Sequence, residues 1–180
     1  GAARVYAIDV GYGQLDYSLR IDKRVTVIER TNARYLKVLE ETVNLVTIDA
    51  SFISLKLLLP TIKGWLQPQS DLIILIKPQF EAGKQEVGKG GVIRDSEVHR
   101  RILGDILAFS QTQCFYVSGL TLSPLKGPAG NIEFLAWLRQ VVANTVHKTE
   151  RQTLGTQKRN PGYLLGVESN DAAASSREQP

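Results

Sequence analysis

The chain has 180 residues, of which 43% are hydrophobic and 22% are charged, and its formal net charge is +4. This length suits one domain with a buried core, and the positive charge weakly favours a polyanionic partner. No membrane span is expected, because no apolar run approaches the roughly 18 residues that cross a bilayer. The single cysteine, Cys114, and two histidines predict neither a disulfide nor a metal site, so a reducing compartment such as the cytoplasm is expected.

The first third of the chain predicts three short strands that end in acidic residues. The strands are "RVYAIDV", "RVTVIE" and "NLVTID", and they end on Asp9, Glu29 and Asp49. Between them, residues 14–20 can form a short helix and residues 33–41 are weakly helical.

A helix and a buried strand follow. Ser54 can cap the helix "LKLLLPTIKGWL", in which Pro60 is expected to cause a kink, and Gln67-Pro68 mark its end. "DLIILIK" is an apolar run typical of a strand that is buried on both faces. It ends in Lys77, at the carboxyl edge where open α/β sheets bind ligands. A lone lysine there is more often one whose amine simply reaches solvent, so Lys77 by itself decides nothing.

The last part of the sequence predicts a loop, a long helix and a hairpin. Residues 81–94 are rich in Gly and Lys, which is typical of a mobile loop. Asp95 or Ser96 can cap a helix that extends to about Gln113, and His99 is expected on the surface of this helix. "CFYVSGLTL" and "IEFLAWLR" are expected to pair as an antiparallel edge of the sheet.

The alternation of strands and helices predicts the fold class. Most strands end in an ionisable residue, and the order favours an α/β fold with a Rossmann-like, doubly wound sheet. We expect the domain to span residues 1–147, followed by a disordered tail over residues 148–180. Because the chain starts at Gly1 and contains no methionine, it is expected to be a processed chain or a fragment.

Two glycine motifs resemble nucleotide-binding loops, but each lacks a required residue. "DVGYGQLD" follows a strand as a dinucleotide fingerprint does, yet Asp16 stands where the third glycine should be. "GKQEVGKG" has the spacing of a phosphate loop, yet Gly90 stands where Ser or Thr would ligate magnesium. Nucleotide hydrolysis is therefore not expected, and a nicotinamide-dependent oxidoreductase is only a distant alternative.

The second of these loops is basic, since it carries Lys84, Lys89 and Arg94. The composition fits a flexible loop that contacts RNA phosphates, and it fits a solvated surface loop about equally well.

Three ionisable residues at strand ends form a candidate active site. Asp49 ends one strand, Lys77 ends the next, and Glu133 begins the last. Buried strands fix such residues, and a carboxylate pair around a lysine holds its amine in position. A salt-bridge network that closes the sheet explains the same residue types equally well.

Five segments together resemble the hemolysin-A-type (TlyA) ribosomal RNA methyltransferases of the FtsJ-like class. They are "RVYAIDVGYGQL", "VTVIERTNARYL", "VTIDASFISLKLLLP", "LIKPQFEAGKQEVGKGGVIRD" and "SPLKGPAGNIEFL", in order over residues 1–138. The resemblance implies methyl transfer from S-adenosylmethionine to a ribose 2′-hydroxyl, with ribosomal RNA and ribosomal subunits as partners and no metal. The alternative from another class is a catalytically silent RNA-binding or interaction module.

The resemblance also implies residue roles. Asp49, Lys77 and Glu133 match the last three members of the family's Lys-Asp-Lys-Glu catalytic set, with Lys77 as the base. Asp9 is expected to hold the ribose hydroxyls of the cofactor, and Asn32 is expected near its adenine.

The amino-terminal part of this family has no counterpart in the chain. In this family the first catalytic lysine, the glycine-rich cofactor loop and a small RNA-binding domain lie upstream of the strand that ends on Asp9. The first and central strand of the sheet lies there too, and it is expected between the strands that end on Asp9 and Asp49. We therefore expect this chain alone to have an incomplete sheet and to bind S-adenosylmethionine weakly or not at all.

Overall fold

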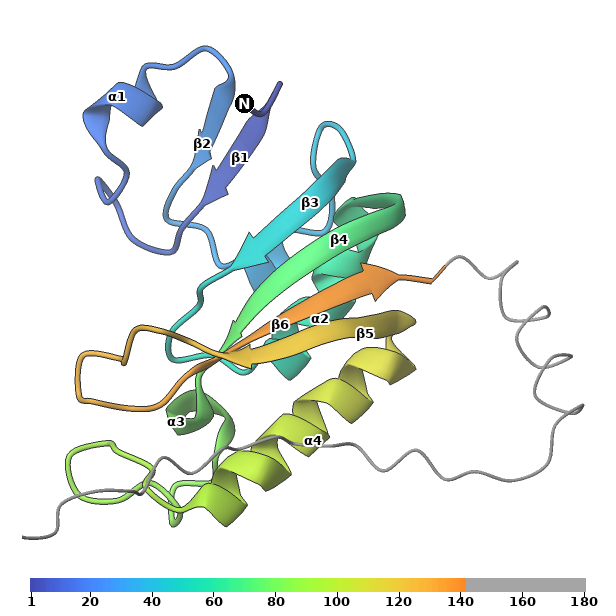
Figure 1. Ribbon diagram of the computed structural model, residues 1–180. Helices are drawn as coiled ribbons and strands as arrows, with labels where there is room; N and C mark the ends of the chain where they lie inside the picture. The colour runs from blue at the N-terminus through green and yellow to red at the C-terminus, as the bar shows by residue number, and fades with distance from the viewer. Residues whose placement is uncertain (142–180) are drawn as a thin grey trace, which may run out of the picture. The chain divides into compact units, whose positions relative to one another are not determined.

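The computed structural model describes residues 1–141, so the expected domain end at residue 147 and the expected tail lie outside the described residues (Figure 1). The strands are β1 (Val5–Ile8), β2 (Val25–Ile28), β3 (Val43–Ile48), β4 (Leu66–Ile76), β5 (Phe115–Leu122) and β6 (Phe134–Gln140). The helices are α1 (Tyr17–Arg20), α2 (Leu55–Ile62), α3 (Pro78–Glu81) and α4 (Ser96–Thr112), with 3-10 turns η1 (Ala33–Tyr35) and η2 (Lys63–Trp65).

The strands form two sheets. β1 pairs with β2 in parallel, and the second sheet has the order β3-β4-β6-β5. In the second sheet β3 is parallel to β4, whereas β6 is antiparallel to both β4 and β5. The α/β class and the antiparallel edge hairpin are therefore confirmed. Within the described residues no backbone hydrogen bond joins β1 to β3.

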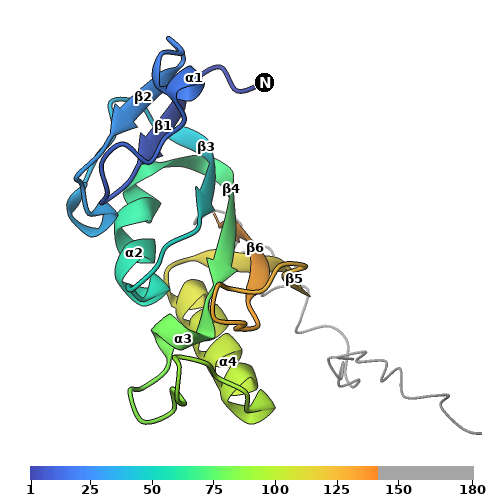
Figure 2. The same ribbon diagram turned by 90° about the vertical axis from the view of Figure 1, so that its left-hand side faces the viewer.

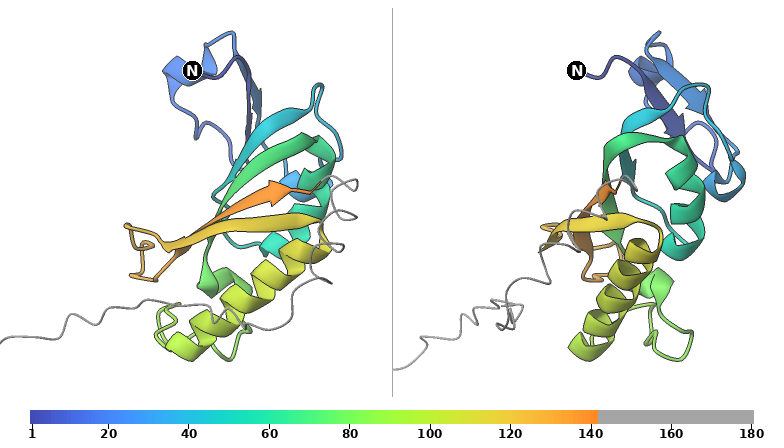
Figure 3. Two further views of the ribbon diagram at one scale, coloured as in Figure 1. Left: turned by 45° about the vertical axis from the view of Figure 1, so that its right-hand side comes forward. Right: turned by 90° about the vertical axis from the view of Figure 1, so that its right-hand side faces the viewer.

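The core lies between the second sheet and two helices. α2 and α4 pack on the same face of this sheet, as Figures 2 and 3 show from several directions. Leu72, Ile74 and Ile76 of β4 point to this face and are fully buried. Each such side chain contributes about 1.5–3 kcal/mol to stability. The expectation that the strand is buried on both faces is wrong in part, because Ile73 and Leu75 on the opposite face are only half-buried.

Both predicted helix caps are present. Ser54 Oγ accepts the N–H of Lys56 at 3.1 Å, and Asp95 Oδ1 accepts the N–H of Glu97 at 2.8 Å. These bonds satisfy amide groups that have no partner inside a helix, which is why α2 and α4 begin at these positions.

Three local expectations differ from the structure. His99 is buried, with 7% exposure, because it lies on the helix face of Ile102 and Ile106, and its ring meets that of Phe134 edge-on at 5.7 Å. Of residues 33–41 only η1 is helical. Gln67 and Pro68 belong to β4 and are not the end of a helix, because α2 stops earlier and η2 turns the chain back towards the sheet.

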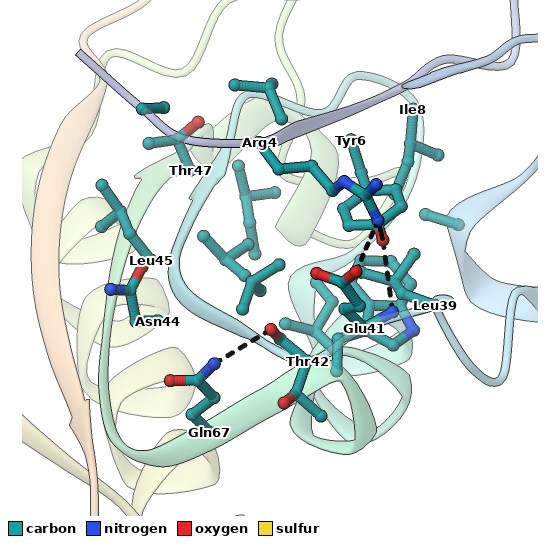
Figure 4. Close-up of a pocket in the computed structure, with 18 of the residues that line it drawn as sticks. Arg4, Tyr6, Ile8, Leu39, Glu41, Thr42, Asn44, Leu45, Thr47 and Gln67 are labelled. Atoms are coloured by element: carbon teal, nitrogen blue, oxygen red, sulfur yellow. Dashed lines mark hydrogen bonds and ion pairs between the residues drawn. The ribbon is translucent and has the colours of Figure 1, made fainter. Parts of the chain in front are cut away.

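A cavity of about 770 Å³ lies between the facing edges of β1 and β3 (Figure 4). Its lining includes Ile8 of β1 and Leu45 of β3. Polar contacts cross it at one end, where Arg4 pairs with Glu41 at 2.7 Å and the Glu41 N–H donates to the Tyr6 hydroxyl at 3.2 Å. Two strand edges with free backbone groups therefore face one another across an open space.

Two further observations concern the part of the chain that the structure describes. No helix in it has the length and apolar character needed to cross a membrane. Among residues 1–141 there is also no group of three or more His, Cys, Asp or Glu side chains placed to hold a metal ion.

Candidate active site

Lys77 and Asp49 meet where β3 and β4 end side by side. The Lys77 Nζ lies 2.6 Å from Asp49 Oδ1 and also donates to Ser51 Oγ at 3.1 Å. The parallel pairing of β3 with β4 puts the carboxyl ends of both strands at one edge of the sheet. This explains why residues 28 positions apart in the sequence form an ion pair.

The backbone around Lys77 is held firmly. Ile76 before it and Pro78 after it are both fully buried, so the lysine cannot move far without disturbing the core. Its φ of −110° and ψ of 97° are extended, as the following proline requires. The Lys77 side chain is 13% exposed, whereas that of Asp49 is 73% exposed. The lysine of this pair is therefore mostly covered by protein, whereas its carboxylate partner is open to solvent.

Glu133 lies next to Lys77 in the sheet register but has a different partner. Ile76 of β4 pairs with Phe134 of β6, so the residues just beyond this pair, Lys77 and Glu133, lie at the same edge. Glu133 is 6% exposed, and its Oε1 accepts a hydrogen bond from Gln79 Nε2 at 2.9 Å. Of the three residues predicted from the sequence, the structure joins Asp49 and Lys77 directly and holds Glu133 through Gln79.

A glycine makes room for the Glu133 carboxylate. A Cβ atom on Gly127 would lie 2.6 Å from Glu133 Oε1, closer than two such atoms can approach. The sequence "GPAGNIE" therefore packs glycine backbone directly against the acid.

Sequence reasoning missed Ser51 and Gln79 as parts of this site. Both are within two residues of a predicted site residue, in "DAS" and "KPQ". Their roles depend on how the loops after β3 and β4 fold, which neither composition nor periodicity encodes.

An exposed aromatic residue lies in the loop after β3, three residues beyond Asp49. Phe52 is 90% exposed and has a φ of 62°, a conformation that is rare for a bulky residue. Its ring lies 4.8 Å from that of Phe80 in α3, the short helix that follows Lys77. The strained backbone holds an apolar ring in solvent, which leaves a surface for a flat apolar group.

Asp9 and Asn32, predicted to bind a cofactor, lie at the ends of β1 and β2 and stabilise turns there. Asp9 Oδ1 accepts the N–H of Gly11 at 2.6 Å, and Asn32 Oδ1 caps η1 by accepting the N–H of Arg34 at 3.0 Å. Both residues are exposed, and the second carboxylate oxygen of Asp9 has no hydrogen-bond partner among residues 1–141. Asp9 thus retains an acceptor that suits a pair of ribose hydroxyls.

Glu29, the other acid at a strand end, is already engaged. It accepts the N–H of Gly13 at 2.8 Å and pairs with Arg20 at 2.5 Å. The Arg20 guanidinium, with the Gly13 amide, holds the pKa of Glu29 below its usual range. This carboxylate therefore ties "GYG" and α1 to β2, which disfavours a role in dinucleotide binding.

Lys84, Lys89 and Arg94 are all exposed on the loop between α3 and α4. The ion pairs found within residues 1–141 include none of the three. The loop is anchored elsewhere, because Asn131 accepts the N–H of Ile93 at 3.0 Å and donates to the Gly91 carbonyl at 2.9 Å. The three cations thus extend from a loop that is tied to the segment preceding Glu133.

This fold is that of the S-adenosylmethionine-dependent methyltransferases. One solved structure of such an enzyme, from Mesorhizobium loti, superimposes on this chain with a TM-score of 0.57 at 13% identity. The matched region covers 78% of this chain and 82% of the other. The chain itself belongs to the FtsJ-like methyltransferase family, whose model matches residues 1–140.

Several individual proteins are similar to this chain. The 16S/23S rRNA (cytidine-2′-O)-methyltransferase TlyA of Mycobacterium tuberculosis is 48% identical over 141 residues, which are 77% of this chain and 53% of that protein. Hemolysin A of Brachyspira hyodysenteriae is 42% identical over 139 residues, 76% of this chain and 58% of that protein. A candidate hemolysin from Streptococcus thermophilus has a TM-score of 0.73 at 39% identity, covering 86% of this chain and 59% of the other. The chain thus spans about half the length of the curated relatives it matches.

Proposed function

We propose that the whole protein transfers a methyl group from S-adenosylmethionine to a ribose 2′-hydroxyl of ribosomal RNA. The observation that carries this proposal is the Lys77–Asp49 ion pair, with Glu133 beside it, at the carboxyl edge of the sheet. Membership of the FtsJ-like family and the named activity of the Mycobacterium tuberculosis relative support the reaction class.

The chemistry follows from what each side chain can do. A ribose hydroxyl is a poor nucleophile until a base takes its proton, and a neutral Lys77 amine within hydrogen-bond reach can accept it. Asp49 then stabilises the ammonium that forms, and Glu133, which Gln79 orients, can accept a hydrogen bond from the ribose. S-adenosylmethionine, when bound, supplies a methyl carbon that is already activated by its sulfonium. The oxygen–carbon bond forms as the sulfur–carbon bond breaks, so positioning supplies most of the catalysis.

Asp9 and Asn32 are the candidate cofactor residues. The carboxylate oxygen of Asp9 that has no partner within residues 1–141 fits ribose hydroxyls, and the exposed side chain of Asn32 is the candidate for the adenine side. The exposed Phe52 ring, in the same loop as Asp49, offers a stacking surface for a nucleobase of the RNA.

The cavity between β1 and β3 is the proposed place of a further strand in the whole protein. Adjacent strands lie about 4.8 Å apart, so one strand between β1 and β3 would join the two sheets and pair both free edges. Val5 and Leu45 are exposed at this cavity although both are apolar, which is the arrangement expected where another strand packs. We propose that this strand comes from the part of the relatives' sequence that this chain does not span.

The loop with Lys84, Lys89 and Arg94 is the proposed contact to the RNA backbone, because it presents three exposed cations that form no ion pair within residues 1–141.

The decisive experiment measures transfer of labelled methyl groups to ribosomal RNA. The enzyme is a chimera that adds to this chain the part of the Bacillus subtilis relative, the candidate rRNA methyltransferase YqxC, that precedes the matched segment. Incorporated label in nucleotides whose 3′ bond resists alkali would support 2′-O-methylation. RNA binding without methyl transfer would favour a catalytically silent RNA-binding module instead.

A further inference from the structure

The loops after β3 and β4 are fastened together at their far ends as well as at the Lys77–Asp49 pair. Glu81, the last residue of α3, accepts the Ser54 hydroxyl on Oε2 at 2.6 Å and the Leu55 N–H on Oε1 at 2.8 Å. The Ser54 hydroxyl oxygen meanwhile accepts the Lys56 N–H. Both carboxylate oxygens of Glu81 are therefore bound to the start of α2.

The two loops form a short ladder of contacts. At one end Lys77 binds Asp49, in the middle Phe80 meets Phe52, and at the other end Glu81 binds Ser54. Each step advances by a few residues in both loops, so that fixing one end constrains the other. We infer that Glu81 is a positioning residue, which holds the loop of residues 49–54 so that Asp49 stays on the Lys77 amine.

Helix capping alone does not explain a carboxylate at this place. Ser54 already satisfies the free amide of Lys56, the second residue of α2, and a neutral acceptor would serve that of Leu55, the first. Glu81 is half-buried, and this burial raises its pKa although the bonds from Ser54 and Leu55 favour the charged form. Burial of this carboxylate costs electrostatic free energy that a neutral cap would avoid. In exchange, the carboxylate makes two strong hydrogen bonds that attach the two loops to each other.

Glu81 does not itself belong to the reacting group. Its two oxygens face Ser54 and Leu55, and it lines a small hollow against Ile102 and Ile106 of α4. The inference rests on the proposed function only in calling the Lys77–Asp49 pair catalytic, and the test below needs no methyl transfer.

The test measures how fast Lys77 is acetylated by dilute acetic anhydride in the 180-residue chain, with exposed Lys23 as the reference within each sample. Asp49 pairs with the Lys77 amine at 2.6 Å, so Asp49→Asn sets the full effect of losing the pair. Exposed or half-exposed ion pairs contribute up to about 1 kcal/mol, which corresponds to about two- to fivefold faster labelling. Glu81→Ala is expected to raise the Lys77/Lys23 ratio towards that of Asp49→Asn.

Two further variants separate positioning from simple loss of stability. Glu81→Gln keeps the side-chain length and an acceptor for the Leu55 N–H but loses the second carboxylate oxygen that accepts the Ser54 hydroxyl, so it should restore only part of the slow labelling. Glu97→Ala, which removes an exposed carboxylate paired with Arg100, should leave the ratio unchanged.

Combining variants gives the sharpest outcome. Because Glu81 acts through Asp49, adding Glu81→Ala to Asp49→Asn should change the ratio little beyond Asp49→Asn alone. An unchanged ratio in Glu81→Ala, with or without a lower melting temperature, or full additivity in the double variant would overturn the inference. If Glu81→Ala does not fold, Ser54→Ala removes one of the two donors to Glu81, and an unchanged ratio there counts equally against it.

Discussion

The Lys77 Nζ lies 2.6 Å from Asp49 Oδ1, yet the lysine side chain is mostly buried and the aspartate is mostly exposed. This asymmetry matters for the proposed reaction. The amine is held by packed strands and shielded from water, while its carboxylate partner lies on a solvent-facing loop. A substrate can therefore approach the ion pair from the solvent-facing side, where the Asp49 carboxylate is exposed.

Replacement of Lys77 tests the proposed base. In the chimera that restores the upstream part, Lys77→Ala should reduce methyl transfer by about 10²–10⁴-fold, the usual contribution of a general base. Binding of S-adenosylmethionine should stay within a few-fold, because Lys77 is not among the proposed cofactor residues. Exposed Lys37 offers the control Lys37→Ala. Near-normal turnover of Lys77→Ala would show that the base is another group.

Neutralising the basic loop tests the RNA contact. The triple variant Lys84→Ala/Lys89→Ala/Arg94→Ala should bind ribosomal RNA more weakly and flatten the plot of log K against log salt by about 2–3 units, since each phosphate contact contributes about 0.7–0.9. The matched control removes three cations elsewhere, in Lys23→Ala/Lys37→Ala/Lys63→Ala. Equal salt slopes for the wild type and the loop variant would show that the loop does not contact RNA and is only a solvated surface loop.

Supplying the proposed strand should change cofactor binding. The 180-residue chain alone is expected to bind S-adenosylmethionine weakly or not at all, because the facing edges of β1 and β3 are unpaired and the cavity between them is open. Isothermal titration of this chain and of the chimera should show binding only in the chimera. Micromolar binding by the short chain would instead identify "DVGYG" as the cofactor loop.

Gly127 provides a test of the Glu133 position. In Gly127→Ala the new methyl group would lie 2.6 Å from Glu133 Oε1, so the carboxylate must move and its bond from Gln79 should weaken. We expect a loss of about 1–2 kcal/mol in the free energy of unfolding, and lower methyl transfer in the chimera. Gly104→Ala in α4, where a Cβ would meet nothing within 4 Å, is the control and should stabilise the helix by about 0.5–1 kcal/mol. Full activity of Gly127→Ala would argue against a role for Glu133.

Glu81 predicts a pH dependence of stability with a defined sign. Its folded-state pKa is raised above the ordinary value of 4.5, mainly by burial, so the folded state binds a proton more tightly than the unfolded state. The resulting stability is present below pH 4.5 and is lost as the pH rises through the raised pKa. In urea titrations, the unfolding free energy of the wild type should therefore fall relative to Glu81→Gln across that window. A constant difference would contradict the raised pKa.

The sequence by itself determined the parts of this protein that depend on neighbouring residues. The strands ending on Asp9, Asp49 and Lys77 follow from short apolar runs, and the starts of α2 and α4 follow from Ser54 and Asp95, because a cap needs only the next few amides. The acids and the lysine at the strand ends could also be predicted as candidate site residues from the sequence, because the carboxyl ends of parallel strands meet at one edge of the sheet.

Only the tertiary structure decided which of these groups touch. The pairing of β6 with β4 brings Glu133 beside Lys77, and loop conformations direct Gln79 to Glu133 and Glu81 to Ser54, contacts that join residues 27 to 54 positions apart. His99 is buried for the same reason, because the sheet lies against that face of α4. Such contacts depend on how distant segments pack against one another. Local periodicity and composition describe only neighbouring residues, so they cannot predict these contacts.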